Sequence, residues 1–165
     1  MKQAKTNRDH RGWIAGGMAG LLSMAALAWR GRAETGSALG PLNAPSHWVW
    51  GDQALAQDRA SWKHTGLGVL IHQGSALMWG LLYDRVFKHR GPARRPIEEL
   101  RDAAAATAVA ATVDLALTPR RFTPGFERRL SPRGTVLVYA AFALGMALGS
   151  RLARRQPGRA CSTRS

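Results

Sequence analysis

The chain has few of the residues on which disulfide-linked folds and most enzymes depend. Its single cysteine, Cys161, excludes an intrachain disulfide. Ten acidic residues face 24 lysines and arginines, and the carboxylates are so scattered that no acid and base pair can be named. The sequence contains no nucleophile elbow, Walker loop or zinc-binding helix motif. We therefore do not predict an enzyme, although the sequence does not exclude one.

Long apolar runs are also missing, since none reaches the roughly 20 residues of an ordinary membrane-spanning helix. Four shorter runs occur instead, at about 13–29, 66–83, 103–118 and 134–150, and basic residues flank each of them. Each run is close to the shortest helix that can cross a hydrocarbon layer about 30 Å thick. The sequence predicts an all-α integral membrane four-helix bundle, a single domain over 1–165 that ends in a basic, disordered tail over 151–165.

The first run has a second interpretation. Its basic start and the small residues near Gly31–Ala33 also fit a cleaved secretory signal peptide. Trp13 and Trp29 stand at its two ends, and tryptophan concentrates where a membrane span meets the headgroups. We therefore expect a span that is retained in the protein.

The net charge of +14 would suit a nucleic-acid-binding protein. The basic residues, however, lie mainly between the apolar runs, where lipid headgroups would meet them. The expected partners are therefore the lipid bilayer and a second copy of the chain or a larger membrane complex, and no nucleic acid. Fifteen basic residues fall on the side of both termini and nine on the other, which predicts cytoplasmic termini in a bacterial inner membrane. The five arginines of 118–133 argue against this orientation.

The connection between the first two runs is long enough to form structure of its own. Pro45 and Ser46 can start a helix, and Trp48, Trp50 and Trp62 suit a membrane interface. The sequence predicts one short helix over 46–60 that lies on the membrane surface or over the mouth of the bundle.

Small residues recur at helical spacing in every run, which predicts close contacts between the spans. These residues are Gly16, Gly20, Gly68, Ala76, Gly80, Ala106, Ala110, Ala141, Gly145 and Gly149. His72 and Asp114 lie on the same rows. Both are costly in a bilayer unless they meet a partner or a wet cavity, so we expect both to point into the bundle.

Several polar residues lie at a similar depth, roughly 6 to 10 Å from one membrane surface when about 1.5 Å is counted per residue. They are Ser23, His72, Gln73, Asp114 and Tyr139. We expect His72 close to Asp114, with His72 or an arginine of 120–133 as the counter-charge of a charged Asp114. Above this layer, the predicted surface helix carries His47 and Asp52. The candidate polar site therefore consists of His47, Asp52, His72, Asp114 and Tyr139.

Two roles are open for these residues. They form either a hydrogen-bonded cluster that fixes helix register in a structural or accessory protein, or the site of a small transporter or membrane-bound redox enzyme. A haem between two histidines is disfavoured, because only His72 lies well inside a run. No spacing among His47, His64, His72 and Asp52 or Asp114 is diagnostic of a metal. We therefore predict no cofactor and no metal, and name no catalytic residue.

Two segments, Ser37–Asp52 and Val113–Glu127, contain the strings SHWVWGD and VDLALTPRRFTPGFE. They resemble segments of small, uncharacterised bacterial multi-pass membrane proteins with four spans. The resemblance implies a membrane protein of that kind, and it implies no activity and no catalytic residue. It covers the same places as the candidate site, because His47 and Asp52 end one segment and Asp114 lies in the other.

Overall fold

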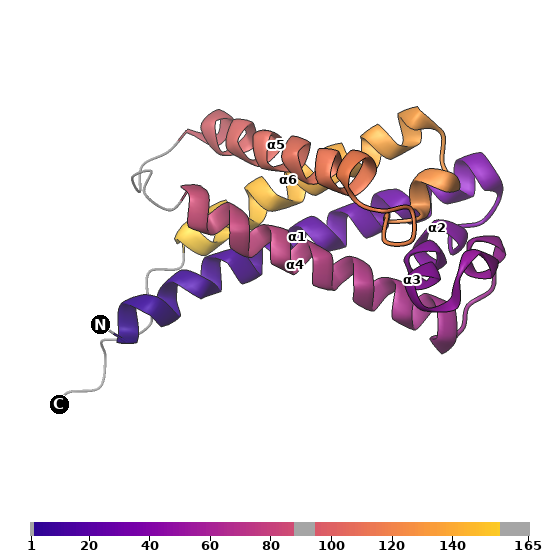
Figure 1. Ribbon diagram of the computed structural model, residues 1–165. Coiled ribbons are helices and arrows are strands. Elements are labelled where there is room, and N and C mark those ends of the chain that lie inside the picture. Colours follow the sequence, from indigo (N-terminus) through magenta and orange to yellow (C-terminus); the bar gives the residue numbers. More distant parts are fainter. Residues whose placement is uncertain (1, 88–94, 156–165) are drawn as a thin grey trace.

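The computed structural model describes residues 2–87 and 95–155, and within these ranges it consists of helices and turns with no strand. Four long helices form a bundle: α1 (Lys2–Thr35), α4 (Leu67–Phe87), α5 (Pro96–Thr112) and α6 (Pro132–Arg155). Two short helices, α2 (Gly40–Asn43) and α3 (His47–Trp50), lie at the end of the bundle opposite the start of α1 (Figure 1). The predicted all-α fold is confirmed.

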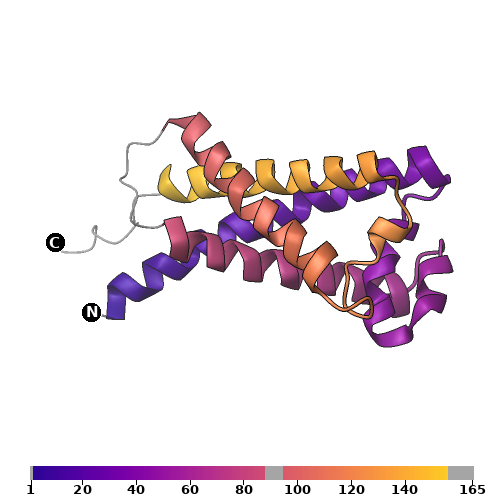
Figure 2. The ribbon, with the colours of Figure 1, turned by 45° about the horizontal axis from the view of Figure 1, so that its top comes forward.

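The long helices are arranged around α1. This helix packs along α6 on one side and α4 on the other, and α5 lies against α6. Figure 2 shows α5 crossing the bundle obliquely, and its contacts with α4 are few. Small side chains dominate the core where α1, α4, α5 and α6 meet: Ala15, Ala19, Ala76, Ala103 and Ala147, together with Tyr83, Phe142 and Met146. The bundle is therefore tight between α1 and its neighbours and looser between α4 and α5.

Glycines allow the backbones of these helices to touch, as the small-residue rows predict. A Cβ atom on Gly80 of α4 would lie 2.4 Å from the Cα of Gly16 in α1. On α6, a Cβ atom on Gly145 would lie 2.4 Å from the carbonyl oxygen of Met18, and Gly149 meets α1 in the same way. Real Cβ atoms do not approach so closely, so these positions tolerate no side chain while the helices stay in contact.

Each long helix begins before or ends after its predicted run. The end of the third run, Val113–Leu117, is a π turn that continues α5, and a π turn at Trp62–Gly66 precedes α4. Residues Arg151–Arg155, predicted as part of the disordered tail, are helical instead and complete α6. Arg151 and Arg154 are held there by Glu99 of α5. The rest of the predicted tail, 156–165, lies outside the described residues.

Two helical segments are long and apolar enough to cross a membrane by length and composition, namely His10–Thr35 and Pro132–Arg155. In α4, His72 and Gln73 interrupt the apolar run, and α5 begins with Glu98, Glu99 and Arg101. Length and composition therefore support two crossings among the described residues, and the four-span arrangement stays a prediction.

The prediction of a single helix over 46–60 is wrong. The helix α3 stops at Trp50, because Gly51 adopts a backbone φ of 71°, which glycine reaches without strain. A 3-10 turn follows at Asp52–Ala56. Ser46 precedes α3 as predicted, yet its hydroxyl lies 3.2 Å from Nδ1 of His64 and does not cap the helix.

The buried Asn43 sets the course of this loop. Its side-chain amide donates to the carbonyl oxygens of Gln57 and Arg59 at 2.9 and 3.1 Å, and its Oδ1 accepts from the Thr65 hydroxyl at 2.7 Å. These three bonds satisfy a polar side chain that no solvent reaches, and they tie the loop to the start of α4. Polar contacts, and not an amphipathic helix, therefore determine the shape of the segment.

Candidate functional site

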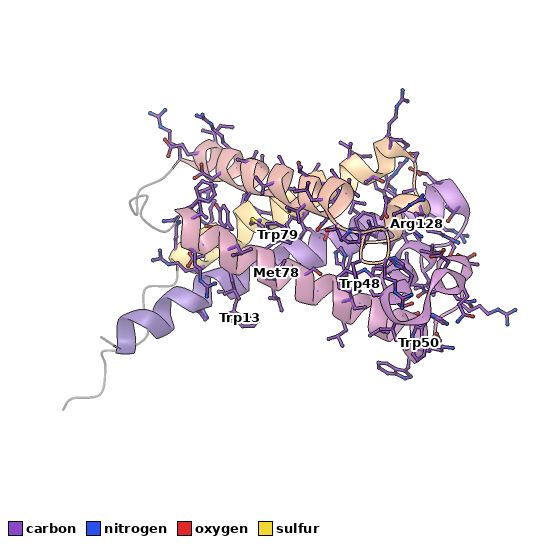
Figure 3. The ribbon with its side chains drawn as sticks, viewed as in Figure 1. Trp13, Trp48, Trp50, Met78, Trp79 and Arg128 are labelled. Atoms are coloured by element: carbon purple, nitrogen blue, oxygen red, sulfur yellow. The ribbon has the colours of Figure 1, made fainter. Side chains whose placement is uncertain are left out.

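A cavity of about 470 Å³ lies between α4 and α5, two helices that make few contacts with each other. Ser23 of α1 and Val138, Tyr139 and Phe142 of α6 line its inner wall. Trp79 of α4 lies on the side that faces α5 (Figure 3), and Trp48 and Phe126 close the end near the short helices. Most of the lining is apolar, which gives the cavity the general composition of a small-molecule site.

Four residues of the predicted polar layer line this cavity, and they form two pairs. His72 Nε2 lies 2.8 Å from the Ser23 hydroxyl, which joins α4 to α1. The Tyr139 hydroxyl donates to Asp114 Oδ2 at 3.1 Å, which joins α6 to the π turn after α5. The fifth member, Gln73, lies elsewhere: its amide is 3.5 Å from the carbonyl oxygen of Gly17.

The hydrogen bonds of Ser23 bear on the protonation of His72. The Ser23 hydroxyl also lies 2.8 Å from the carbonyl oxygen of Ala19, one turn back in α1. When its single proton points to that carbonyl, the hydroxyl accepts from His72, so Nε2 of the imidazole carries the proton. Nδ1 is then an acceptor, and no described residue donates to it. In this arrangement His72, which lines the cavity, keeps an unused acceptor.

Phe126 contacts both polar pairs. Its ring centroid lies 6.2 Å from that of His72 and 6.0 Å from that of Tyr139. The hydrogen-bond partner of Asp114 is Tyr139. The two expected counter-charges were His72 and an arginine of 120–133, and neither is hydrogen-bonded to Asp114 in the described structure. His72 and Asp114 line the same cavity, and the Phe126 ring contacts both His72 and Tyr139, the partner of Asp114.

The other two candidate residues, His47 and Asp52, line a second cavity of about 500 Å³. His47 is only 1% exposed, and its Nδ1 donates to the carbonyl oxygen of Ala44 at 2.8 Å. Asp52 accepts from Nη1 of Arg128 at 3.1 Å. The predicted site is therefore divided in two, with His72, Asp114 and Tyr139 in one part and His47 and Asp52 in the other.

Trp48 connects α3 to the turn before α6. Its indole nitrogen donates to the carbonyl oxygen of Thr123 at 2.7 Å, and its ring meets the edge of Phe122 with centroids 6.0 Å apart. Arg121 donates to the carbonyl oxygen of Trp48 at 3.2 Å. The short helix α3 and the turn before α6, far apart in sequence, are thus fixed to each other.

Sequence reasoning missed a buried ionic cluster at the opposite end of the bundle. Glu99 has a side chain only 2% exposed, and its carboxylate lies 2.9 Å from Arg154 and 3.7 Å from Arg151. A signal for it was present, because Glu99 and Asp102 lie three residues apart on α5, as do Arg151 and Arg154 on α6. The cluster fastens the start of α5 to the end of α6.

No protein-family model, no curated protein and no solved structure matches this chain. In the parts of the chain that the structure describes, no three side chains of His, Cys, Asp or Glu are grouped so that they could hold a metal ion. The fold and site together define a helical bundle with an apolar cavity and a separate basic one. These two cavities and the outer faces of the helices are the features that bear on function.

Proposed function

We propose that this chain is a multi-pass protein of a bacterial inner membrane whose bundle binds an apolar small molecule in the cavity between α4 and α5. The cavity itself is the observation that supports the proposal. Its volume of about 470 Å³ lies in the range of small-molecule sites, and its apolar wall carries a few polar groups that can orient a ligand. The role is an accessory one, binding rather than catalysis.

Exposed apolar side chains on all four long helices support a membrane location. Leu21 of α1, Leu70 of α4, Val109 of α5 and Val136 of α6 are each more than half exposed. Soluble domains rarely leave so much apolar surface open to water. The apolar windows of α1 and α6 are 39% and 50% buried, unlike the largely buried core helix of a soluble protein. A lipid bilayer would cover these faces.

The lengths of α4 and α5 are compatible with four crossings. With 21 residues, α4 is about 32 Å long, close to the roughly 30 Å of a hydrocarbon layer. The 17 residues of α5 span about 26 Å, and the π turn after them adds to this. We propose that all four helices cross, with both termini in the cytoplasm because the basic residues favour that side.

The chemistry of the cavity indicates an apolar ligand with one hydrogen-bonding group. Ring and aliphatic side chains, among them Trp79 and Phe142, would contact its hydrocarbon part, and the free acceptor of His72 suits a hydroxyl donor. Gly74 and Met78 line the cavity and are exposed on α4, so the cavity reaches the outer face of the bundle. In a bilayer that face meets lipid, so a ligand would enter from the membrane.

A second candidate is a small transporter or redox enzyme that uses His72 and Asp114. The hydrogen bond from Tyr139 to Asp114 favours it, because it places an exchangeable proton on the cavity wall. Replacing Asp114 by asparagine would keep a hydrogen-bond partner for Tyr139 and remove the carboxyl group. Transport or redox activity that this change abolishes, with folding intact, would favour the second candidate.

Photolabelling tests the binding proposal. We expect 3-azioctanol, an apolar alcohol with a photoactivatable diazirine, to label the segment around Ala110–Asp114 of the full-length protein in detergent, and excess octanol to suppress this labelling. Val113→Trp fills the cavity and should weaken binding about tenfold, equivalent to about 1.4 kcal/mol. Ala108→Trp, on the exposed side of α5, should leave the labelling unchanged. Equal labelling in the two variants, or labelling that octanol does not suppress, would refute the cavity as a binding site.

A further inference from the structure

The second cavity carries a concentration of positive charge that the proposed binding of an apolar molecule does not use. It lies between α3 and the turn before α6, and His47, Gly51, Asp52, Arg120, Arg121 and Arg128 line it. Three guanidinium groups face a single carboxylate. Figure 3 shows Arg128 at the end of the bundle where the short helices gather. The cavity is thus electropositive. It lies at the end of the bundle that the sequence predicts to be at a membrane surface.

Much of this positive charge is available to a ligand. Asp52 pairs with Arg128, whose Nε also lies 3.9 Å from Glu127 Oε1 and whose Nη2 donates to the carbonyl oxygen of Arg120 at 2.7 Å. Arg121 uses one Nη2 group on the carbonyl oxygen of Trp48. The Arg120 side chain has no hydrogen bond or ion pair with any described residue. Two arginines therefore keep donors that could meet an anion, and the third is held in place by its carboxylate.

His47 gives the cavity a buried polar atom with no partner. The side chain is almost fully buried, and Nε2 is the ring nitrogen that makes no hydrogen bond within the described structure. Nδ1 is fixed by the carbonyl oxygen of Ala44, and Gly125, at a φ of 85°, packs so closely that a Cβ there would lie 2.7 Å from Nδ1. An unsatisfied buried polar atom is costly, and a ligand that hydrogen-bonds to it would remove that cost.

We propose that this cavity binds a phosphate group through His47, Arg120 and Arg121, with Arg128 as a positioned third cation. Planar guanidinium groups match the oxygen pairs of phosphate, and the three arginines outnumber the two carboxylates paired with Arg128, Asp52 and Glu127, which leaves about one positive unit for an anion. Nε2 of His47 suits a phosphate in either protonation state, because it accepts from a P–OH group when neutral and donates to a P–O⁻ group when protonated.

The phosphate can come from solution or from a lipid headgroup. Trp48 and Phe122 line the apolar cavity and directly follow His47 and Arg121 in sequence, so the two cavities are neighbours. A phospholipid could therefore place its headgroup in the basic cavity and a chain in the apolar one. The lipid source rests on the proposed membrane location, whereas binding of free phosphate does not.

Two titrations of the full-length protein, purified in a neutral detergent at 0.15 M salt, test the proposal. One adds inorganic phosphate and follows the heat of binding. The other adds phosphatidic acid, with phosphatidylcholine as reference, and counts bound lipids by native mass spectrometry. We expect saturable binding of one phosphate group per chain in at least one of them. The Arg120→Gln/Arg121→Gln variant should lose about tenfold or more in affinity, as expected for lost charge-assisted hydrogen bonds.

Arg133→Gln is the matched control, because Arg133 is exposed near the same end of the bundle and does not line the cavity. Loss confined to the double variant with inorganic phosphate supports a soluble ligand, and loss only with phosphatidic acid supports a lipid headgroup. No saturable binding in either titration, or equal losses in the double variant and the control, would overturn the proposal. Photolabelling by 3-azioctanol should be the same in the double variant as in the wild type. A negative result for phosphate binding can therefore be distinguished from a negative result for the apolar cavity.

Discussion

Gly16→Val is expected to lower the free energy of unfolding by about 3 kcal/mol, at the upper end for overpacking in a tight core. A Cβ atom at Gly16 would lie 2.5 Å from the carbonyl oxygen of Ala76 and 2.7 Å from the Cα of Leu77. Both are backbone atoms, so the new side chain cannot be accommodated by a rotamer change. The helices α1 and α4 must separate, and thermal unfolding in detergent, followed by circular dichroism, measures the loss.

The neighbouring glycine provides the control. A Cβ atom at Gly17 would meet nothing within 4 Å, so Gly17→Val adds the same side chain to the same helix without a collision. Its effect on stability should stay within about 1 kcal/mol, the scale of helix propensity. Equal destabilisation by the two variants would show that the contact between α1 and α4 is not as close as Gly16 and Gly80 indicate.

Glu99→Leu is expected to cost about 3 to 5 kcal/mol of stability, the usual effect of removing one partner of a buried ion pair. Arg154, with a side chain only 14% exposed, would keep its charge and lose the carboxylate that lies 2.9 Å from it. The ionic cluster fastens α5 to α6, so we expect α5 to loosen first. Hydrogen exchange along α5, compared with α1, would detect this.

A double variant separates the ion pair from packing. Glu99→Leu/Arg154→Met replaces the pair by apolar side chains and should regain most of the lost stability, because an apolar replacement of a buried pair is often neutral. Arg101→Gln, exposed in the same turn of α5, should have little effect. A double variant no more stable than Glu99→Leu would mean that the charges themselves are required at this end of the bundle.

The inward direction of His72 and Asp114 could be predicted because it follows from helical spacing, in α4 for His72 and along α5 into its π turn for Asp114. A polar residue in an apolar run must avoid lipid, and the rows of small residues identify the face that packs against other helices. The fixed rise per residue also placed Ser23, His72, Asp114 and Tyr139 at one level. These four do line one cavity. Gln73 does not, because the next position along a helix points about 100° away.

The partners of these residues could not be predicted, because residues outside the regular helices determine them. Phe126 lies in a 3-10 turn and contacts both His72 and Tyr139, the partner of Asp114, and no periodicity in the sequence places it there. Gly51 and Asn43 break the expected helix over 46–60 through a backbone conformation and three side-chain hydrogen bonds. Amphipathic patterns indicate helix faces and carry no information on such contacts.

Spin-label accessibility in lipid vesicles tests most directly whether α4 and α5 lie in a bilayer. In a Cys161→Ser background, nitroxides at Met78→Cys and Val109→Cys would report on the exposed faces of α4 and α5, and one at Trp62→Cys, where the side chain is 93% exposed, on the end of the bundle. A membrane bundle predicts that oxygen reaches the labels at 78 and 109 while the water-soluble nickel complex NiEDDA does not, with the reverse at 62. NiEDDA access at 78 and 109 equal to that at 62 would place both helices in water and contradict a four-helix membrane bundle.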